Sequence, residues 1–198
     1  MDGQIVILNG PPRAGKSSIA AVMQGTFDGV WLNLGVDVFM RMAPARLGPG
    51  IGLRPGGERP DLEAFVVEGY RAMYASIAAH SRLGFNVVVD AVHHDDYSRP
   101  LGVLARCAMQ LAGLPVLFVG VRCPVDVALE RRRATWGGAG FTPGSGVRHP
   151  VELWHEAVHR HGVYDLEVDT SELSPEECAE RIADRLAAGP GEAIRHVR

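Results

Sequence analysis

The sequence lacks several features that would identify whole classes of protein. It has no extended run of Lys and Arg, and its net charge of -3 and pI near 6.2 do not predict binding to nucleic acid or to an anionic membrane. No apolar run approaches the roughly 20 residues that span a bilayer, and the N-terminus has no basic stretch followed by an apolar one. We therefore expect a cytoplasmic protein with a small-molecule partner, and a homo-oligomer remains open.

Cysteine is scarce. Cys107, Cys123 and Cys178 lie far apart in apolar or helical contexts, which suits buried free thiols better than disulfides. The 198 residues, 46% of them hydrophobic, can supply one full core but leave no room for a second large domain. We expect a single domain over residues 1–188 and a flexible tail over 189–198.

Short apolar runs alternate with helical patterns along the chain. The predicted strands are 4–8, 30–34, 86–89, 115–121 and 166–169, and the predicted helices are 16–24, 61–80, 99–111, 124–133, 150–159 and 174–186. Ser174 and Glu177 form a capping box at the last helix. This alternation predicts an α/β fold, a three-layer sandwich whose parallel sheet of about five strands has its ligands at the strands' carboxyl ends.

Two Gly-rich stretches interrupt the alternation. We expect a substrate loop at about 42–60 and a lid at about 131–150, because long loops in compact domains commonly serve these purposes. The alternative is that both stretches are merely mobile.

The clearest motif lies between the first predicted strand and the first predicted helix, where the chain fits G-x-x-x-x-G-K-[ST]. The residues expected to hold the phosphates of ATP or GTP are Gly10, Pro11, Pro12, Arg13, Ala14, Gly15, Lys16, Ser17 and Ser18. Successive amides of such a loop form an anion nest, and Lys16 adds a point charge for the β- and γ-phosphates. A chance match in a Gly-rich turn is disfavoured by the flanking strand and helix.

Two aspartates follow strands beside this loop. Asp90 ends a Val87-Val88-Val89-Asp90 segment typical of a Mg2+-holding acid, with Ser17 as the second oxygen ligand, although it could simply cap a turn. Asp37 is the candidate catalytic base for a substrate hydroxyl. It could also be the N-cap of a helix starting at Val38.

Three consecutive arginines, Arg131, Arg132 and Arg133, precede the predicted lid. Helical neighbours diverge by about 100°, so only one or two of them can face the same phosphates. The alternative is a solvated basic helix end that complements the helix dipole.

A second motif, His155-Glu156-Ala157-Val158-His159, matches the H-E-x-x-H pattern of zinc hydrolases. The usual third ligand does not follow it, and only chance geometry would let His149 or His161 replace it. His93 and His94 form another polar cluster, which we expect to face the substrate pocket rather than a metal.

The ordered set of motifs resembles the chloramphenicol phosphotransferase-like kinases. The resemblance runs from about Ile5 to Leu186 and rests on segments 7–10, 14–17, 31–37, 87–90, 120–123 and 164–170. It implies ATP-dependent transfer to a hydroxyl of an antibiotic-like molecule, on a P-loop NTPase fold similar to nucleoside monophosphate and shikimate kinases. It also implies that Asp37 is the base, that Arg131 lies on the lid helix and steadies the transferring charge, and that Thr170 adjoins the nucleotide base.

The match is weakest where the acceptor would bind, at 39–53 and 92–99, and Ala91 stands where the family has a second acid. We therefore expect a small-molecule O-phosphotransferase using ATP or GTP and Mg2+, with catalytic Asp37, Lys16 and Arg131 and metal ligands Ser17 and Asp90. The leading acceptor is an antibiotic such as chloramphenicol. The alternatives are a kinase for a nucleoside antibiotic or another metabolite, a nucleotide-binding regulator without transferase activity, and a zinc hydrolase.

Overall fold

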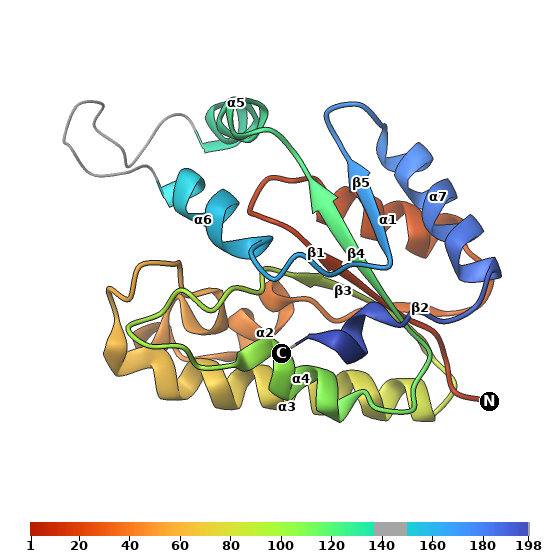
Figure 1. Cartoon of the computed structure of the whole chain (residues 1–198), viewed down its shortest axis with the longest axis horizontal. Coiled ribbons are helices and arrows are strands. Elements are labelled where there is room, and N and C mark those ends of the chain that lie inside the picture. Colours follow the sequence, from red (N-terminus) through yellow and green to blue (C-terminus); the bar gives the residue numbers. More distant parts are fainter. Residues whose placement is uncertain (137–149, 198) are drawn as a thin grey trace.

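The computed structural model describes residues 1–136 and 150–197, in which strands and helices alternate (Figure 1). The strands are β1 (Ile5–Asn9), β2 (Trp31–Asn33), β3 (Asn86–Ala91), β4 (Val116–Arg122) and β5 (Leu166–Asp169). The α-helices are α1 (Lys16–Thr26), α2 (Val36–Met42), α3 (Glu63–Arg82), α4 (Val103–Gln110), α5 (Val125–Trp136), α6 (Pro150–Val158) and α7 (Pro175–Ala187). Short 3-10 helices are η1 (Ala45–Leu47), η2 (Gly50–Gly52), η3 (Pro60–Leu62) and η4 (Ala193–His196).

The strands form one parallel sheet in the order β2-β3-β1-β4-β5. β1 is central, and its last residue, Asn9, is in register with Ala91 of β3 and Gly120 of β4. Because all strands run the same way, their carboxyl ends meet at one edge. The loops that follow β1, β2 and β3 are therefore neighbours at that edge.

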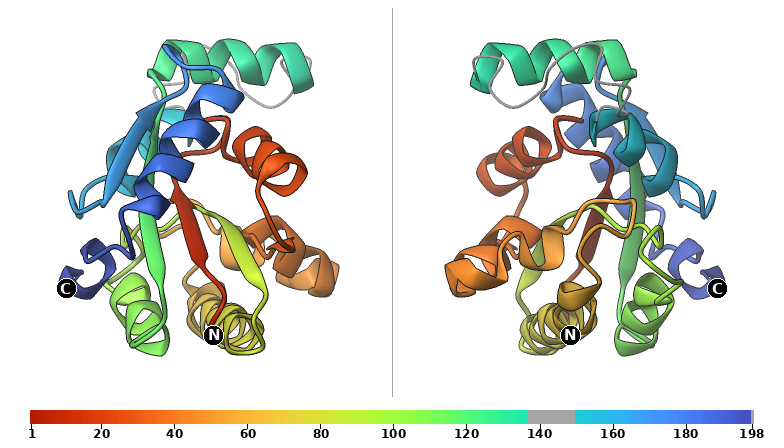
Figure 2. Two further views of the ribbon diagram at one scale, coloured as in Figure 1. Left: turned by 90° about the vertical axis from the view of Figure 1, so that its right-hand side faces the viewer. Right: turned by 90° about the vertical axis from the view of Figure 1, so that its left-hand side faces the viewer.

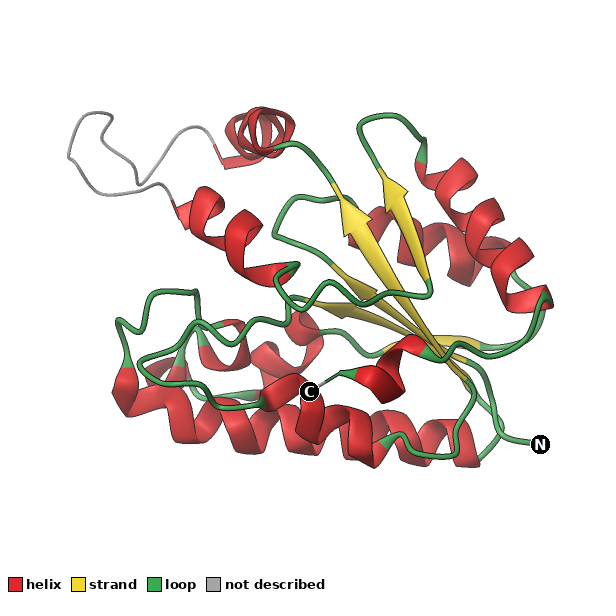
Figure 3. Cartoon of the chain, in the orientation of Figure 1, coloured by secondary structure: helices red, strands yellow, loops and turns green. Residues whose placement is uncertain are grey.

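Helices cover both faces of the sheet, as the sequence predicted (Figures 2 and 3). Successive strand residues point to opposite faces: Ile5 and Ile7 of β1 pack in the same cluster as residues of α3 and α4, whereas Val6 and Leu8 pack with residues of α1 and α7. All four of these β1 side chains are fully buried. The two-sided burial explains why the strands read as continuous apolar runs.

Most predicted elements are confirmed within one to three residues. The capping box is present: Ser174 Oγ accepts from the Glu177 amide at 3.2 Å, and the Glu177 carboxylate accepts from the Ser174 amide at 2.7 Å. The helix predicted from Arg99 is the exception, because α4 begins only at Val103. The Asp95 carboxylate accepts the amides of Leu101 and Gly102 and holds this segment in a loop.

The segment predicted as a substrate loop, 42–60, is folded against the core. It contains η1 and η2 and reaches the start of η3, and Ile51 and Leu53 are only 4% and 2% exposed. Ile51 reaches into α3 at Gly69, where an added Cβ would lie 2.3 Å from the Ile51 Cγ2. Gly69 therefore makes room for the loop. Most of the predicted lid, residues 137–149, lies outside the described residues.

The segment that the sequence indicates as a flexible tail, 189–198, contains η4 and packs against the core. Ala193 and Ile194 of η4 are 7% and 4% exposed and join the core cluster under α3 and α4. The Asp165 carboxylate, 4% exposed, accepts the amides of Phe118, Glu192 and Ala193. The polar, Gly-Pro-rich composition of 189–192 concealed these long-range contacts.

Among the described residues, no helix combines the length and apolar character that crossing a bilayer requires. Cys107, Cys123 and Cys178 are buried free thiols, which confirms the prediction.

Candidate active site

The phosphate-binding loop occupies the predicted place between β1 and α1. Gly15 has a φ of 89°, a left-handed conformation that glycine adopts without strain, and it precedes the first residue of α1. The Lys16 ammonium donates to the carbonyls of Gly10 and Pro11, both at 2.8 Å, so the side chain folds back across its own loop. The N-terminus of α1 and the Lys16 charge together favour an anion at this position.

Ser17 and Asp90 meet beside Lys16. The Ser17 hydroxyl donates to one Asp90 oxygen at 2.6 Å, and the other Asp90 oxygen lies 3.4 Å from the Lys16 ammonium. Two hard oxygen donors side by side, next to an anion-binding loop, fit the ligand preference of Mg2+. The predicted pairing of these residues is therefore present in the fold.

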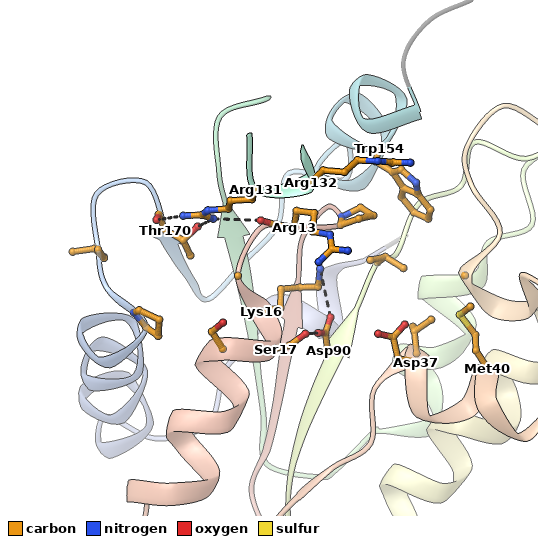
Figure 4. Close-up of a pocket in the computed structure, with 18 residues that line it drawn as sticks. Arg13, Lys16, Ser17, Asp37, Met40, Asp90, Arg131, Arg132, Trp154 and Thr170 are labelled. Atoms are coloured by element: carbon orange, nitrogen blue, oxygen red, sulfur yellow. Dashed lines mark hydrogen bonds and ion pairs between the residues drawn. The ribbon is translucent and has the colours of Figure 1, made fainter. Parts of the chain in front are cut away.

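Asp37 lies in the first turn of α2, and its carboxylate points into the same pocket (Figure 4). The suggestion that it caps a helix starting at Val38 was wrong, because α2 begins at Val36 and its N-cap is Gly35. A Cβ on Gly35 would lie 2.9 Å from the Asp90 carbonyl oxygen. Gly35 thus lets the start of α2 approach the end of β3, which brings Asp37 to the pocket that Asp90 lines.

These residues line one cavity of about 720 Å³. Its lining residues are Pro12, Arg13, Gly15, Lys16, Ser17, Ser18, Val36, Asp37, Met40, Gly52, Asp90, Val92, Arg131, Arg132, Trp154, Thr170, Leu173 and Pro175. In Figure 4, Lys16, Ser17 and Asp90 gather at one place, called here the Lys16 end. Asp37 and Met40 lie to the right of them with Trp154 above, and these three residues are called here the Asp37 end. The loop segment 42–60 contributes Gly52 to this cavity.

The Asp37 end contains residues that sequence reasoning missed. Trp154 of α6 is 7% exposed and packs edge-on against His94, with ring centroids 5.0 Å apart. Trp154 and Val92 belong to no motif, whereas Met40 lies in the aromatic and methionine run from Phe39 to Met42, which the sequence offered either as pocket lining or as core. The exposed Met42, 67% accessible, does not line the cavity.

Arg131 lies at the opposite side of the cavity, on Thr170. Its guanidinium donates to the Thr170 hydroxyl at 2.9 Å, to the Thr170 carbonyl at 2.7 Å and to the Arg13 carbonyl at 3.3 Å. The Thr170 hydroxyl in turn donates to the Ala14 carbonyl at 2.9 Å. Arg131 therefore joins α5, the loop after β5 and the phosphate-binding loop. Arg132 also lines the cavity, whereas Arg133 does not.

A buried polar network surrounds Asn9, the residue that precedes the phosphate-binding loop. The Asn9 side chain donates from Nδ2 to the Tyr164 hydroxyl at 3.0 Å, and its Oδ1 accepts a hydrogen bond from the His93 backbone amide at 2.8 Å. The Tyr164 hydroxyl lies 2.7 Å from His159 Nδ1. Because Asn9 immediately precedes Gly10, this network fixes the point at which the loop leaves β1.

The zinc-hydrolase alternative receives no support. Among residues 1–136 and 150–197, no group of three His, Cys, Asp or Glu side chains could hold a metal ion. His149 lies outside the described residues. Burial lowers the pKa of His155, and it lowers the pKa of His159 to about 3, so both imidazoles are neutral near pH 7.

His93 and His94 do not line the cavity that contains Asp37, which corrects the expectation that they face it. They line a second cavity of about 330 Å³, together with residues of α4 and the end of α6. His93 Nε2 lies 2.6 Å from the Tyr74 hydroxyl, and His94 Nε2 lies 2.9 Å from the Leu53 carbonyl. Both histidines are thus held by polar contacts to Tyr74 of α3 and to the Leu53 carbonyl.

Two solved structures share this fold. The Mycobacterium tuberculosis APS kinase CysC, in complex with AMPPNP and APS, superposes with a TM-score of 0.69 at 20% identity, covering 94% of this chain and 98% of that one. A tunicamycin resistance protein from Deinococcus radiodurans has a TM-score of 0.61 at 20% identity, covering 96% of this chain and 99% of that one. Together with the phosphate-binding loop, these similarities confirm the P-loop kinase fold.

Sequence comparison gives the closer assignment. A Mycobacterium tuberculosis protein whose name proposes an O-phosphotransferase is 27% identical over 207 residues, or 96% of this chain and 84% of that protein. The model of the family described as chloramphenicol phosphotransferase-like protein matches residues 3–187. This protein, a P-loop phosphotransferase, therefore belongs to the chloramphenicol phosphotransferase-like family.

Proposed function

We propose that this protein transfers the γ-phosphoryl group of ATP or GTP to a hydroxyl of a small molecule. The observation that carries the proposal is that one cavity places Asp37 across from Lys16, Ser17 and Asp90. A base for an acceptor hydroxyl and the residues for a triphosphate thus line the same space. A nucleotide-binding regulator would have no need for the first of these.

The residues would act as follows. Lys16 and the amides of the phosphate-binding loop hold the triphosphate, and Ser17 and Asp90 hold Mg2+. Bound Mg2+ would neutralise charge on the phosphate oxygens. Asp37 orients the acceptor hydroxyl and takes its proton while the new oxygen–phosphorus bond forms and the bond from the γ-phosphorus to the leaving diphosphate breaks. Positioning and electrostatics would supply most of the acceleration.

Two further roles remain predictions. Thr170 is proposed to adjoin the nucleotide base, which agrees with its place on the opposite side of the cavity from Asp37 in Figure 4. Arg131 was expected to steady the transferring charge. Its guanidinium lies on Thr170 and on the Arg13 carbonyl, which places it beside the proposed base site.

The acceptor that we propose is a hydroxylated antibiotic, with chloramphenicol as the first compound to test. Val36, Met40, Val92 and Trp154 offer an apolar surface beside the Asp37 carboxylate. Such a surface suits a substrate with an apolar body and a hydroxyl at one end. A nucleoside antibiotic is the second candidate, since a structural neighbour is a tunicamycin resistance protein.

The test is a search for phosphorylated products by mass spectrometry. The protein is incubated with Mg2+, with ATP or GTP, and with a panel that includes chloramphenicol and nucleoside antibiotics. We expect one compound to gain a single phosphoryl group. The absence of any such product with either donor, in a panel extended to hydroxylated metabolites, would favour the regulator.

Asp37→Asn is the matched control for this experiment. It removes the base and keeps the size of the side chain, so we expect transfer to fall by about 10²–10⁴-fold while the nucleotide dissociation constant changes by less than about twofold. Transfer at the wild-type rate would show that Asp37 is not the base.

A further inference from the structure

A positive charge besides Lys16 and Mg2+ would stabilise the transferring phosphoryl group, because charge spreads over its equatorial oxygens as the bond to the leaving group breaks. Among the described residues, three arginines line the cavity: Arg13, Arg131 and Arg132. Arg13 belongs to the phosphate-binding loop, whereas Arg131 and Arg132 are consecutive residues of α5, whose side chains diverge by about 100°. The question is which of them the fold aims at the Lys16 end.

Arg131 is engaged elsewhere. Both of its terminal nitrogens donate to Thr170, at 2.9 Å and 2.7 Å, and one also donates to the Arg13 carbonyl. In Figure 4 its side chain extends toward Thr170, on the side of the cavity away from Asp37. To reach the transferring group it would have to give up these contacts.

Arg13 has an unusual backbone. Among the described residues it is the single non-glycine with a positive φ, 70°. For an L-residue this left-handed conformation costs about 1–2 kcal/mol, and such strain persists where the surrounding structure enforces it, commonly at functional sites. Gly15, two residues later, also has a positive φ, so the loop is shaped by two left-handed residues.

The surroundings that enforce this conformation are visible. Arg131 donates to the Arg13 carbonyl at 3.3 Å, and the Thr170 hydroxyl donates to the next carbonyl, that of Ala14, at 2.9 Å. With the carbonyl of Arg13 held toward Arg131, its side chain leaves the backbone in another direction. Figure 4 shows it pointing into the cavity, toward the side where Lys16 lies.

We propose that Arg13 is a further catalytic residue, whose guanidinium contacts the γ-phosphoryl group during transfer, and that Arg131 is the positioning residue that keeps the loop aimed. This inference rests on the function proposed above. Arg13 exchanges no proton in the step, since the acceptor proton goes to Asp37. The charge arrives with the phosphate-binding loop itself, so no movement of α5 is needed to supply it.

The inference is tested by nucleotide binding, which needs no knowledge of the acceptor. Isothermal titration calorimetry with Mg2+ gives dissociation constants for ADP and for AMPPNP, which differ at the γ position. The decisive quantity is how much more tightly AMPPNP binds than ADP. Arg13→Gly is the main variant because glycine accepts the positive φ, and Arg13→Asn is the second, since asparagine also tolerates it and restricts the loop more.

We expect both Arg13 variants to weaken AMPPNP binding by about ten- to a hundredfold, the worth of one charge-assisted hydrogen bond, and ADP binding by less than about twofold. Arg131→Ala should weaken both nucleotides together, as a displaced loop would. Arg133→Ala, an exposed arginine outside the cavity, is the matched control and should change neither.

An unchanged preference for AMPPNP in both Arg13 variants would overturn the inference. If the preference were lost in Arg132→Ala instead, the charge would come from α5. These outcomes leave the proposed function intact. If the wild-type protein bound neither these adenine nucleotides nor their guanine counterparts, the proposed function would fail, and the inference with it.

Discussion

The two ends of the cavity are built in different ways. At the Lys16 end, the first two residues of α1 and the end of β3 supply the chemistry, and the Asp90 carboxylate contacts both Ser17 and Lys16. At the Asp37 end, α2, α6 and the loop after β3 each contribute a side chain, and the surface is mostly apolar. The Lys16 end therefore suits the triphosphate, a ligand that kinases share. At the Asp37 end, a change in one helix or loop can alter acceptor specificity without altering the others.

The largest expected effect belongs to the Lys16 end. Lys16→Ala removes the charge that lies against the Gly10 and Pro11 carbonyls and Asp90. We expect nucleotide affinity to fall by about a hundredfold, since charged hydrogen bonds contribute about 1.5–3 kcal/mol each, and transfer to fall with it. Calorimetry and product formation are the measurements. Arg71→Ala, which breaks an exposed pair with Glu68 outside the cavity, should leave both unchanged.

The next effect is a loss of stability in acid, and it concerns His93, which contacts Tyr74 of α3 and does not line the cavity that contains Asp37. Burial lowers the pKa of His93 to about 3, against about 6.5 in an unfolded chain, so below pH 6.5 the unfolded state binds the proton and the native state does not. Its contribution to stability is complete above pH 6.5 and is lost progressively as the pH falls toward 3. By pH 5 we expect a loss of about 2 kcal/mol from this side chain alone.

Urea unfolding at pH 7.5 and pH 5 measures this loss. Burial also lowers the pKa of His159 to about 3 and that of His161 to about 4, so the wild-type protein should lose more than His93 alone explains. His93→Gln should be less sensitive to acid than the wild type. Equal sensitivity in the two proteins would exclude His93 as a source.

Trp154→Ala should separate the two ends. Removing this ring takes away much of the apolar surface beside Asp37, and we expect the KM for the acceptor to rise by about tenfold, with nucleotide affinity unchanged. Trp154→Phe preserves packing against His94, so its KM for the acceptor should lie between the values of the wild type and of Trp154→Ala. Steady-state kinetics in each substrate gives the answer, and an equal loss in both would mean that the ends are not independent.

The smallest effect concerns α7, whose first residue, Pro175, lines the cavity near Thr170. Ser174→Ala removes one half of the capping box and should lower the free energy of unfolding by about 1 kcal/mol. Ser171→Ala is the comparison, because the Ser171 hydroxyl contacts only the nearby Asp169 carboxylate among the described residues. Thermal unfolding of both variants gives the difference.

The difference between the two ends also explains which parts of the site the sequence could predict. The phosphate-binding loop, Asp90 and the capping box each depend on residues close in the chain, so their spacing was enough. Asp37 was found because it follows a strand, but its place in α2 depends on the close approach of Gly35 to Asp90. Trp154 and Val92 reach the cavity only through the packing of whole elements, for which no short pattern exists.

The contacts of Arg131 are a second case in which the sequence could not predict which residues meet. The sequence placed this residue on the helix that leads to the lid, and the structure confirms α5. Its donors, however, go to Thr170 and to the Arg13 carbonyl, 39 and 118 residues away. Pairings at such separations follow from the sheet order, which the pattern of strands does not determine.

The amides that satisfy Asp165 have a consequence for how the chain folds during synthesis. Glu192 and Ala193 donate to this carboxylate from 27 and 28 residues further along, and Gly191 donates to the carbonyl of Val116 in β4. Because a ribosome delivers the chain from its N-terminus, at about 5–20 residues per second, β4 and β5 emerge before these partners do. The phosphate-binding loop and the strands on both sides of it therefore leave the ribosome before the segment that completes this side of the sheet.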